Sequence, residues 1–398
     1  MRRAAVAALL AGVLAAPAAA SASLQTALAR ALAVPHVSLA ATGAVAIDLE
    51  TGETVYSRNP TLSLLPASNE KLAVTYAALT ALGPSFTIET DVLGEGTQTG
   101  TTWQGDLVLK GYGDPTLSTA DLRALAQQVR AAGITRVTGR VLGDESWFDS
   151  RRTALGWKSA FYINESPPLS ALIVDRAWLG HYTSHDPALA AAQSFRAALV
   201  RAGVRIAGGA AHGTADDAAT SLAEVDSPPL SEIVQWMDRV SDNFTAEMLV
   251  KELGAVQADS GTTAAGVGFI TGLLQQAGVP LTGVRLVDGS GLSLLDRETP
   301  QALASLLTVM WNDAETRWEL LSSLPIAARS GTLVHRMVHT AAAGVVRAKT
   351  GTTDNASALS GFAGDRYVFS VLQNGAPVSW TWARRAQDKF AAVLAAAQ

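Results

Sequence analysis

The chain has 398 residues, of which 48% are hydrophobic and 16% charged, a balance typical of globular proteins with a large core and not of disordered chains. Its formal net charge of −5 and its lack of basic runs argue against nucleic acid as a partner. The sequence contains no cysteine, which excludes disulfide bonds, thiol catalysis and attachment of a lipid to a cysteine.

Residues 1–22 have the parts of a secretory signal peptide. Arg2 and Arg3 precede an apolar run, and small alanine-rich residues end the run in a pattern that fits an A-x-A cleavage site. No later segment reaches the ~18 consecutive apolar residues of a membrane span, so we expect no transmembrane anchor after cleavage. The mature protein, from about Ser23, is therefore expected to be exported, in the periplasm or associated with the cell wall.

The segment after the signal peptide predicts a β-hairpin followed by a helix. Apolar and polar residues alternate across residues 42–59, on both sides of a turn at residues 50–52. A helix begins near Ser68 and ends at Gly83, because glycine is a common stop signal. From about Asp91, short strands alternate with turns rich in Gly and Thr. An order of helix, glycine and strand is predicted at residues 119–144, 188–213 and 268–289.

The second half of the chain begins with helices and ends with strands. Two helices are predicted at residues 228–240 and 243–256, and a last helix over residues 382–397. Three strands precede that last helix, at residues 344–352, 356–364 and 366–374. Strands near both ends of the chain predict one α/β (α+β) domain, formed by residues 23–90 and 227–398. A smaller mixed α/β insertion over residues 91–226 is expected to interrupt it.

Ser68 and Lys71 are three positions apart at the start of the first helix. This spacing places a hydroxyl and an amine on one helical face, where the partial positive charge of the helix start favours an oxyanion. The alternative is that Ser68 caps the helix and Lys71 is solvated. The chain has six lysines and 24 arginines. Because a buried lysine can lose its proton and an arginine cannot, a lysine kept here points to a general base.

Three short motifs follow one another along the chain: Ser68-x-x-Lys71, Ser241-Asp242-Asn243 and Lys349-Thr350-Gly351. Each alone is a weak signal. Ser241-Asp242-Asn243 could be a polar turn between helices, and Lys349 could protect an edge strand from aggregation. Their order, at a helix start, an inter-helix loop and a strand, is that of penicillin-binding proteins and serine β-lactamases.

Two other patterns compete with this set. Residues 329–332, Arg-Ser-Gly-Thr, mimic the last motif but do not follow a β-rich run, so we assign them to structure. The histidine pairs His335/His339 and His181/His185 are four residues apart but lack the H-E-x-x-H pattern of zinc peptidases. We therefore expect all the histidines to be surface or structural residues, and no metal site.

The sequence resembles the D-alanyl-D-alanine carboxypeptidase/endopeptidase family of low-molecular-mass class C penicillin-binding proteins, peptidase family S13. The resemblance extends to further stretches from about residue 44 to the C-terminus: LPASNEKL, LKGYGDPTL, DGSGLSLLDRETP, SGTLVHRM and AKTGTTDNASALSGF. It implies a β-lactamase/transpeptidase-like domain, an antiparallel sheet with helices. It also implies a serine hydrolase that cleaves peptidoglycan stem peptides without a metal or organic cofactor and is acylated by β-lactams.

The resemblance assigns a role to each motif residue. Ser68 would attack the carbonyl between two D-alanines, and neutral Lys71 would take its proton. Ser241 would relay a proton to the leaving amine, while Asn243 would orient Lys71 and the substrate amide. Lys349 would add positive potential.

The strand motif would bind the substrate. Thr350 and Thr352 would hold the terminal carboxylate, and Gly351 would let the peptide approach the strand closely. The backbone N–H groups of Ser68 and Thr352 would form the oxyanion hole.

The chain also departs from the family. Ser68 and Ser241 are 173 positions apart, and residues 170–187 connect the two parts of the insertion so directly that the family's third domain is expected to be absent. The family binds the amino end of a peptide side chain with an acidic residue of the insertion. Asp149 is the nearest counterpart, with Asp144 or Glu145 as equal alternatives and a plain solvated loop as the simplest explanation.

Other functions stay open. A serine β-lactamase would share the nucleophile, although the long insertion argues against it. A catalytically silent peptidoglycan-binding protein is the second alternative, against which Ser68, Lys71 and Lys349 stand in a lysine-poor chain. The sequence does not decide between carboxypeptidase and endopeptidase activity, the preferred residue at the third peptide position, or the oligomeric state.

Overall fold

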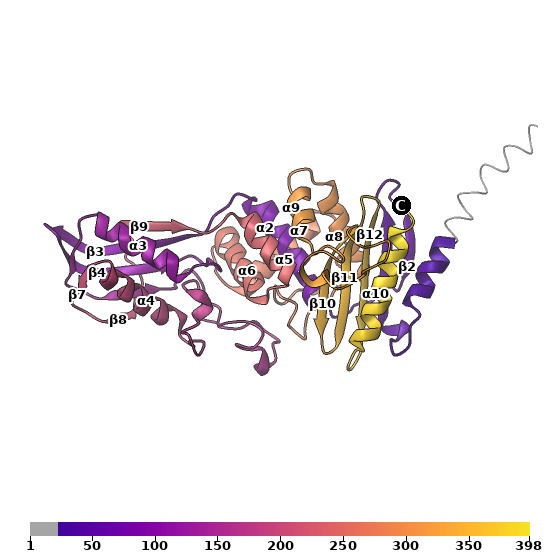
Figure 1. Cartoon of the computed structure of the whole chain (residues 1–398), viewed down its shortest axis with the longest axis horizontal. Helices are drawn as coiled ribbons and strands as arrows, with labels where there is room; N and C mark the ends of the chain where they lie inside the picture. Colours follow the sequence, from indigo (N-terminus) through magenta and orange to yellow (C-terminus); the bar gives the residue numbers. More distant parts are fainter. Residues whose placement is uncertain (1–22) are drawn as a thin grey trace, which may run out of the picture.

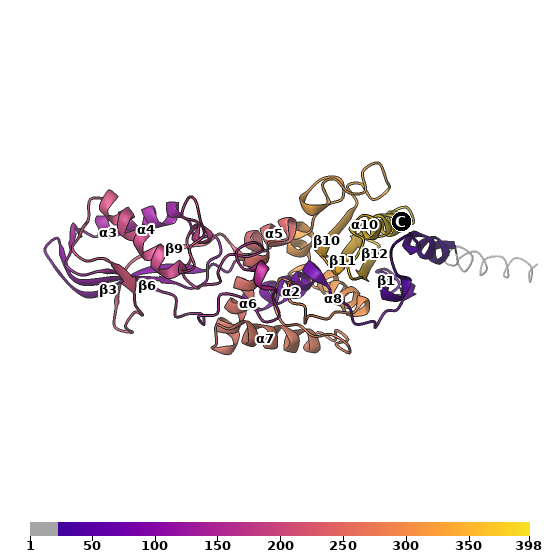
Figure 2. The same ribbon diagram turned by 90° about the horizontal axis from the view of Figure 1, so that it is seen from below.

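The computed structural model describes residues 23–398; the expected signal peptide, residues 1–22, lies outside the described residues. Within the described part, the strands form two sheets at opposite ends of an elongated molecule, with a block of helices between them (Figures 1 and 2). No helix in residues 23–398 is both long enough and apolar enough to cross a membrane.

The first sheet combines both ends of the chain. It has five antiparallel strands in the order β10-β11-β12-β1-β2, so the C-terminal strands pair with the N-terminal hairpin. The strands are β1 (Thr42–Asp48), β2 (Thr54–Arg58), β10 (Val346–Thr353), β11 (Ala356–Ala363) and β12 (Tyr367–Asn374). The helix α10 (Trp380–Ala395) and the helix over residues 23–32 share a buried apolar cluster with this sheet.

The other face of this sheet packs on a block of helices that contains α2 (Lys71–Leu82). Residues 71–79 of α2 are all buried, as expected for a helix that is apolar on every side. The rest of the block consists of α5 (Leu230–Val240), α6 (Asn243–Ala258), α7 (Thr263–Gln276), α8 (Pro300–Asn312) and α9 (Arg317–Ser323). Figure 1 shows α2, α5 and α6 between the two sheets.

The second sheet is mixed and has its own core. A long antiparallel pair, β3 (Glu89–Thr99) and β4 (Thr102–Gly111), is extended by β9 (Thr220–Asp226) on one side. Short parallel strands follow on the other side: β5 (Arg136–Val137), β6 (Val141–Asp144), β7 (Arg205–Ile206) and β8 (Ala210–His212). Helices α3 (Thr119–Ala131) and α4 (Pro187–Arg201) pack on it through a separate apolar cluster.

The architecture confirms the predicted fold class, an antiparallel sheet with helices interrupted by a mixed α/β unit. The domain boundaries at residues 91 and 226 stay a proposal, which is supported by the span of the second sheet from Glu89 to Asp226. The absence of a third domain also stays a proposal. The short 3-10 helices are Leu39–Ala41, Ala67–Glu70, Ser159–Phe161, Asp175–Ala177 and Gly331–Leu333.

One predicted strand is wrong. Residues 282–289 follow α7 and its glycine stop as expected, but they form only an isolated bridge between Arg285 and Arg297. Side chains bind this backbone in place of a neighbouring strand, because Asp296 accepts from the N–H of Val287 at 2.8 Å and Asp288 accepts from that of Gly291 at 2.7 Å. The segment therefore forms a tight loop, residues 288–293, which reaches the site described next.

Candidate active site

Ser68 lies in the 3-10 turn Ala67–Glu70, directly before α2, and does not cap that helix. Neither the turn nor α2 has a side-chain cap in the described part of the chain. Lys71 is completely buried and its Nζ is 3.0 Å from Ser68 Oγ. Both features of the simpler alternative, a capping serine and a solvated lysine, are therefore contradicted by the structure.

The contacts of the Lys71 amine match those of a neutral base. Its Nζ is 2.8 Å from Asn243 Oδ1 and 2.7 Å from the carbonyl oxygen of Ser290, and both oxygens only accept hydrogen bonds. A neutral amine has two hydrogens for these two acceptors. The charged amine donates its third hydrogen to Ser68 Oγ at 3.0 Å, so loss of that proton leaves a lone pair facing the Ser68 hydroxyl. This is the arrangement required for removing a proton from that hydroxyl.

Ser290 contributes through its main chain, a role that the sequence reasoning missed. The loop that carries Ser290 is bound by Glu247, whose carboxylate accepts from the backbone N–H groups of Gly289 at 3.0 Å and Ser290 at 2.8 Å. A Cβ on Gly291 would lie 1.9 Å from the carbonyl oxygen of Ala67. This glycine, with φ of +78°, therefore lets the loop press against the turn that carries Ser68.

Ser241 and Asn243 lie at the junction of α5 and α6. Ser241 ends α5 in the left-handed conformation, with φ of 62°, and Asp242 then caps α6 by accepting from the N–H of Thr245 at 2.7 Å. Burial raises the pKa of Asp242, but the ion pair with Arg176 and the hydrogen bonds from Thr245 together lower the pKa below its ordinary value.

Two residues between β3 and β9, Arg176 and Glu165, contact this junction. Arg176 pairs with Asp242 at 2.7 Å and lies over the ring of Phe244, 5.3 Å from its centroid. Its segment, residues 175–177, has three consecutive positive φ angles. The Nδ2 of Asn243 also donates to the carbonyl oxygen of Glu165 at 3.1 Å.

Lys349 is on β10, the edge strand of the first sheet, but it is completely buried and so does not protect an exposed edge. Its Nζ donates to Ser241 Oγ at 2.7 Å and to the carbonyl oxygen of Thr350 at 3.0 Å. Asn69 joins the Ser68 turn to this strand by donating to the carbonyl oxygen of Lys349 at 3.0 Å. The structure thus brings residues of all three motifs into one cluster.

Burial makes both lysines easier to deprotonate. Desolvation lowers the pKa of Lys71 to about 8, although several carboxylates oppose this. Desolvation, followed by repulsion from Lys71, lowers the pKa of Lys349 to about 7. Asp238, a fully buried residue of α5, raises both values because it is negatively charged.

A cavity of about 520 Å³ opens over Ser68. Its lining combines predicted residues with ones that the sequence reasoning did not select: Ser68, Glu165, Ser241, Asn243, Leu292, Thr332, His335, Arg336, Thr350, Thr352 and Arg384. Gly351 lies beneath it, since a Cβ there would be 2.7 Å from the carbonyl oxygen of Pro66 and 3.1 Å from the Ser68 nitrogen. The strand therefore approaches the Ser68 turn as closely as only glycine permits.

The segment of residues 329–332, assigned to structure from the sequence, contributes to this cavity. Thr350 Oγ1 donates to Thr332 Oγ1 at 2.7 Å, and His335 follows in the same lining. The resemblance of this segment to the strand motif was the signal that it also lies near the site.

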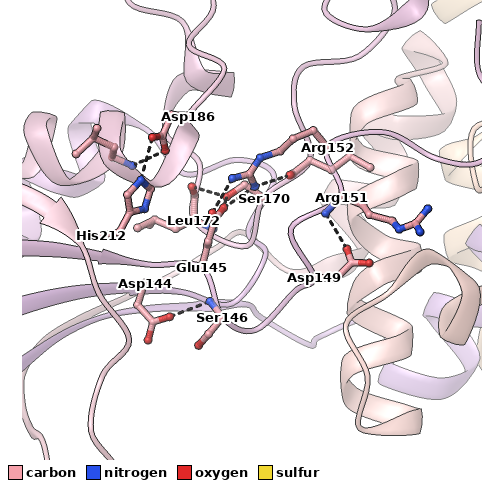
Figure 3. A network of polar contacts seen from close by, with 12 residues as sticks. Asp144, Glu145, Ser146, Asp149, Arg151, Arg152, Ser170, Leu172, Asp186 and His212 are labelled. Atoms are coloured by element: carbon pink, nitrogen blue, oxygen red, sulfur yellow. Dashed lines mark hydrogen bonds and ion pairs between the residues drawn. The ribbon is translucent and has the colours of Figure 1, made fainter. Parts of the chain in front are cut away.

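Asp149 is not brought to this cavity. It lines a separate cavity of about 390 Å³, and its carboxylate binds Lys251 and, at 3.3 Å, the backbone N–H of Arg151. Figure 3 shows it apart from the network in which Arg152 holds Glu145, one of its alternatives. The other alternative, Asp144, accepts from the N–H of Ser146 at 2.8 Å. A binding role for Asp149 stays an untested prediction.

A cluster of buried acids lies behind the Ser68 turn. Neither carboxylate oxygen of Glu70 has a hydrogen-bond partner within residues 23–398. Burial, then repulsion from Asp296 and Glu298, raises the pKa of Glu70 well above its ordinary value. Burial raises the pKa of Glu298 to about 8 and, with repulsion from Asp288, that of Asp296 to about 10. These groups are therefore mainly protonated at neutral pH.

This cluster predicts that the protein loses stability as the pH rises. The unfolded chain releases these protons near pH 4.5, while the folded chain keeps them to about pH 8, so each pH increase in that window favours unfolding. We expect the melting temperature to fall between pH 6 and pH 9. Glu70→Gln should raise it by a few degrees at pH 8 and have little effect at pH 5, because only the ionised form is penalised.

Calorimetry at both pH values measures this effect. Glu232→Gln, at an exposed position of α5, is the matched control and should change neither value. An equal effect of Glu70→Gln at the two pH values would contradict a role for ionisation.

The comparisons with known proteins agree with this geometry. A model of the D-Ala-D-Ala carboxypeptidase 3 (S13) family matches residues 24–183 and 178–397. A D-alanyl-D-alanine carboxypeptidase from Actinomadura sp. (strain R39) is 34% identical, with 86% of this chain and 79% of the relative covered.

Two solved structures share the fold. Penicillin-binding protein 4 (dacB) from Haemophilus influenzae has a TM-score of 0.81 at 22% identity, covering 92% of this chain and 97% of that one, and is also known in complex with a β-lactam. A predatory peptidoglycan endopeptidase from Bdellovibrio bacteriovorus has a TM-score of 0.53 at 18% identity, covering 84% and 86%.

Proposed function

The chain belongs to the D-Ala-D-Ala carboxypeptidase 3 (S13) family, and on this premise we propose that it cleaves peptidoglycan stem peptides through an acyl-enzyme on Ser68. The observation that carries the proposal is the buried Lys71 amine, 3.0 Å from Ser68 Oγ, whose two other neighbours are both acceptors. Export of the protein to the periplasm or cell wall is part of the proposal, because the substrate lies there.

Acylation follows from these contacts. Ser68 Oγ attacks the carbonyl carbon between the two D-alanines as Lys71 accepts the hydroxyl proton. The oxyanion forms opposite the backbone N–H groups of Ser68 and Thr352, which is the type of donor pair that stabilises such charge. The C–N bond then breaks, and the Ser241 hydroxyl, 2.7 Å from Lys349 Nζ, gives a proton to the leaving amine. The proton that Lys71 took from Ser68 restores the Ser241 hydroxyl, so Lys71 is neutral again before deacylation.

Deacylation returns the enzyme. A water molecule attacks the ester, its proton passes to Lys71, and Ser68 leaves with a proton restored. A β-lactam follows the same first steps, but its leaving amine stays tethered to the acyl group. We therefore propose that β-lactams acylate Ser68 and that this acyl-enzyme is hydrolysed slowly.

The decisive experiment incubates the purified protein with a fluorescent penicillin and with a cross-linked muropeptide. A long-lived covalent adduct together with release of D-alanine supports the proposal. Rapid turnover of the penicillin would show a β-lactamase instead, and no adduct and no turnover would show a silent binding protein. Release of D-alanine and cleavage of the cross-link, measured separately, determine the balance of carboxypeptidase and endopeptidase activity.

The rate should depend on pH through the lysine pair. kcat/KM follows the protonation of the free enzyme, in which Lys71 and Lys349 repel each other and titrate as a pair. Because the neutral amine of Lys71 is the active form, we expect kcat/KM to rise about tenfold per pH unit at low pH. This rising limb should level off between about pH 7 and about pH 8. Asp238→Asn removes a charge that raises both pKa values and should shift this limb to lower pH.

A pH profile of D-alanine release by the parent and by Asp238→Asn measures this shift. Asp216→Asn, an exposed substitution on the insertion, should leave the limb in place. A limb that moves to higher pH in Asp238→Asn would contradict the assignment.

Arg176 should affect catalysis without touching substrate. Arg176→Ala removes the partner of Asp242 and loosens the loop that positions Ser241 and Asn243, so we expect kcat to fall roughly 10- to 100-fold with little change in KM. Arg176→Lys should recover part of kcat. Arg151→Ala, at an exposed position, should keep the kcat of the parent. Steady-state kinetics measure both constants, and an unchanged kcat in Arg176→Ala would contradict this role.

A further inference from the structure

We propose that Arg384 binds the C-terminal carboxylate of the substrate and so determines the preference for a free acid over a neutral peptide end. This inference rests on the proposed function, because it assigns a substrate-binding residue to the same cavity. Arg384 lies on α10, outside the three motifs, and was not selected from the sequence. Its guanidinium contacts the hydroxyl of Thr352, directly after the Lys349-Thr350-Gly351 motif.

The position of Arg384 relative to the two threonine hydroxyls carries the argument. Its Nη2 donates to Thr352 Oγ1 at 3.3 Å, and both residues line the cavity over Ser68. A hydroxyl that accepts from a guanidinium keeps its own hydrogen to donate. Thr352 and Arg384 therefore present adjacent donors, and Thr332, which accepts from Thr350 at 2.7 Å, also keeps its hydrogen in the same lining. Such a set fits the oxygens of a carboxylate.

The charges of the lining show why Arg384 is the cation that remains for the substrate. Arg336, the other guanidinium, is committed to Asp388, with contacts of 2.7 and 2.9 Å. Arg384, by contrast, has no ion pair with a carboxylate in residues 23–398. The ion pairs of this part of the chain are Arg336–Asp388, Arg140–Asp106, Arg152–Glu145, Lys158–Asp354, Arg176–Asp242, His212–Asp186, Lys251–Asp149 and Arg366–Asp48.

Glu165, the acidic residue of the lining, forms no ion pair with Arg384 in residues 23–398. Glu165 belongs to the insertion and contacts Asn243 through its backbone carbonyl, whereas Arg384 contacts the Thr352 hydroxyl of β10. Two separate contacts thus occur in the cavity lining, one between Asn243 and Glu165 and one between Thr352 and Arg384. A peptide that ends in a carboxylate would be held at its charged end by Arg384.

The neighbouring residue supplies a matched control. Arg385 is also exposed on α10, but its guanidinium lies over the ring of Trp382, 5.3 Å from the centroid, and it does not line the cavity over Ser68. Arg384→Ala and Arg385→Ala therefore remove the same charge from adjacent positions, and only the first removes it from the cavity.

The test compares an acylated D-Ala-D-Ala with its C-terminal amide. We expect Arg384→Ala to lower kcat/KM for the acid roughly 10- to 100-fold, the effect of losing a hydrogen bond to a charged group, and to change that for the amide less than threefold. Arg384→Lys should recover part of the acid activity, and Arg385→Ala should match the parent. Equal losses for acid and amide, or no loss for either, would overturn the proposal.

A second readout does not depend on peptide turnover. The rate of covalent labelling by a penicillin, compared with that by its methyl ester, should fall in Arg384→Ala for the acid alone. A parent that is labelled but releases no D-alanine would overturn the proposed peptidase function and leave this labelling ratio as the test of Arg384. An unchanged ratio would overturn the role of Arg384 by itself.

Discussion

Ser68→Ala should abolish both covalent labelling by penicillin and release of D-alanine. Loss of the nucleophile of a serine peptidase lowers kcat on the order of 10⁶-fold, because no other group can form the acyl-enzyme. The fold should be unaffected, since Ser68 caps no helix and its hydroxyl is hydrogen-bonded to the Lys71 amine. Mass spectrometry of the protein after incubation with penicillin, with a D-alanine assay alongside, gives both readings.

The matched control for this substitution is Ser63→Ala. Ser63 is exposed and its hydroxyl donates to the carbonyl oxygen of Gly283 at 2.7 Å, away from the cavity. That variant should label and turn over like the parent. An adduct that persists in Ser68→Ala would place the nucleophile elsewhere and remove the basis of the proposed mechanism.

Lys71 should be nearly as necessary as Ser68, and arginine should not replace it. General-base catalysis is commonly worth about 10²- to 10⁴-fold, and we expect Lys71→Ala to lose at least that much in kcat/KM. Arg does not lose its proton at any usable pH, so Lys71→Arg should be equally inactive although it keeps the positive charge. If Lys71 acted only through its charge, Lys71→Arg would retain activity.

Because Lys71 is completely buried, each variant needs a check of its fold. Thermal unfolding separates loss of chemistry from loss of structure. Lys389→Ala, at an exposed position of α10, is the control for removing a lysine and should keep the parent activity. In all variants that remain folded, the rate of acylation by penicillin in a single turnover reports the proton-transfer step without product release.

The sequence predicted most of the elements because their patterns are local. The hairpin at β1 and β2, the helix that follows Ser68, the helix junction at Ser241 and the three C-terminal strands all formed within a few residues of their predicted bounds. The strand predicted at residues 282–289 failed, because carboxylates bind its backbone in place of a partner strand: Asp296, nine residues after Val287, and Glu247, 42 residues before Gly289. Local pattern does not record such partners.

The sequence also determined the residue types of the site, since three motifs in a fixed order and a lysine kept among arginines point to one chemistry. Their separate roles stay predictions, which the contacts among Ser68, Lys71 and Lys349 support. What the sequence did not disclose is the set of groups that act through position alone. The Ser290 carbonyl on Lys71 and the Arg384 guanidinium at Thr352 carry no motif.

Tertiary structure alone decided these contacts, for a physical reason. A motif is readable when the chemistry needs a given side chain at a given spacing along one helix or strand. A backbone carbonyl is present in every residue, and an arginine fits many surfaces, so neither type marks its function. Asp149 shows the converse, because a plausible acid at a plausible position is held by Lys251 in another cavity. Only the packing of distant segments determines which of these groups face Ser68.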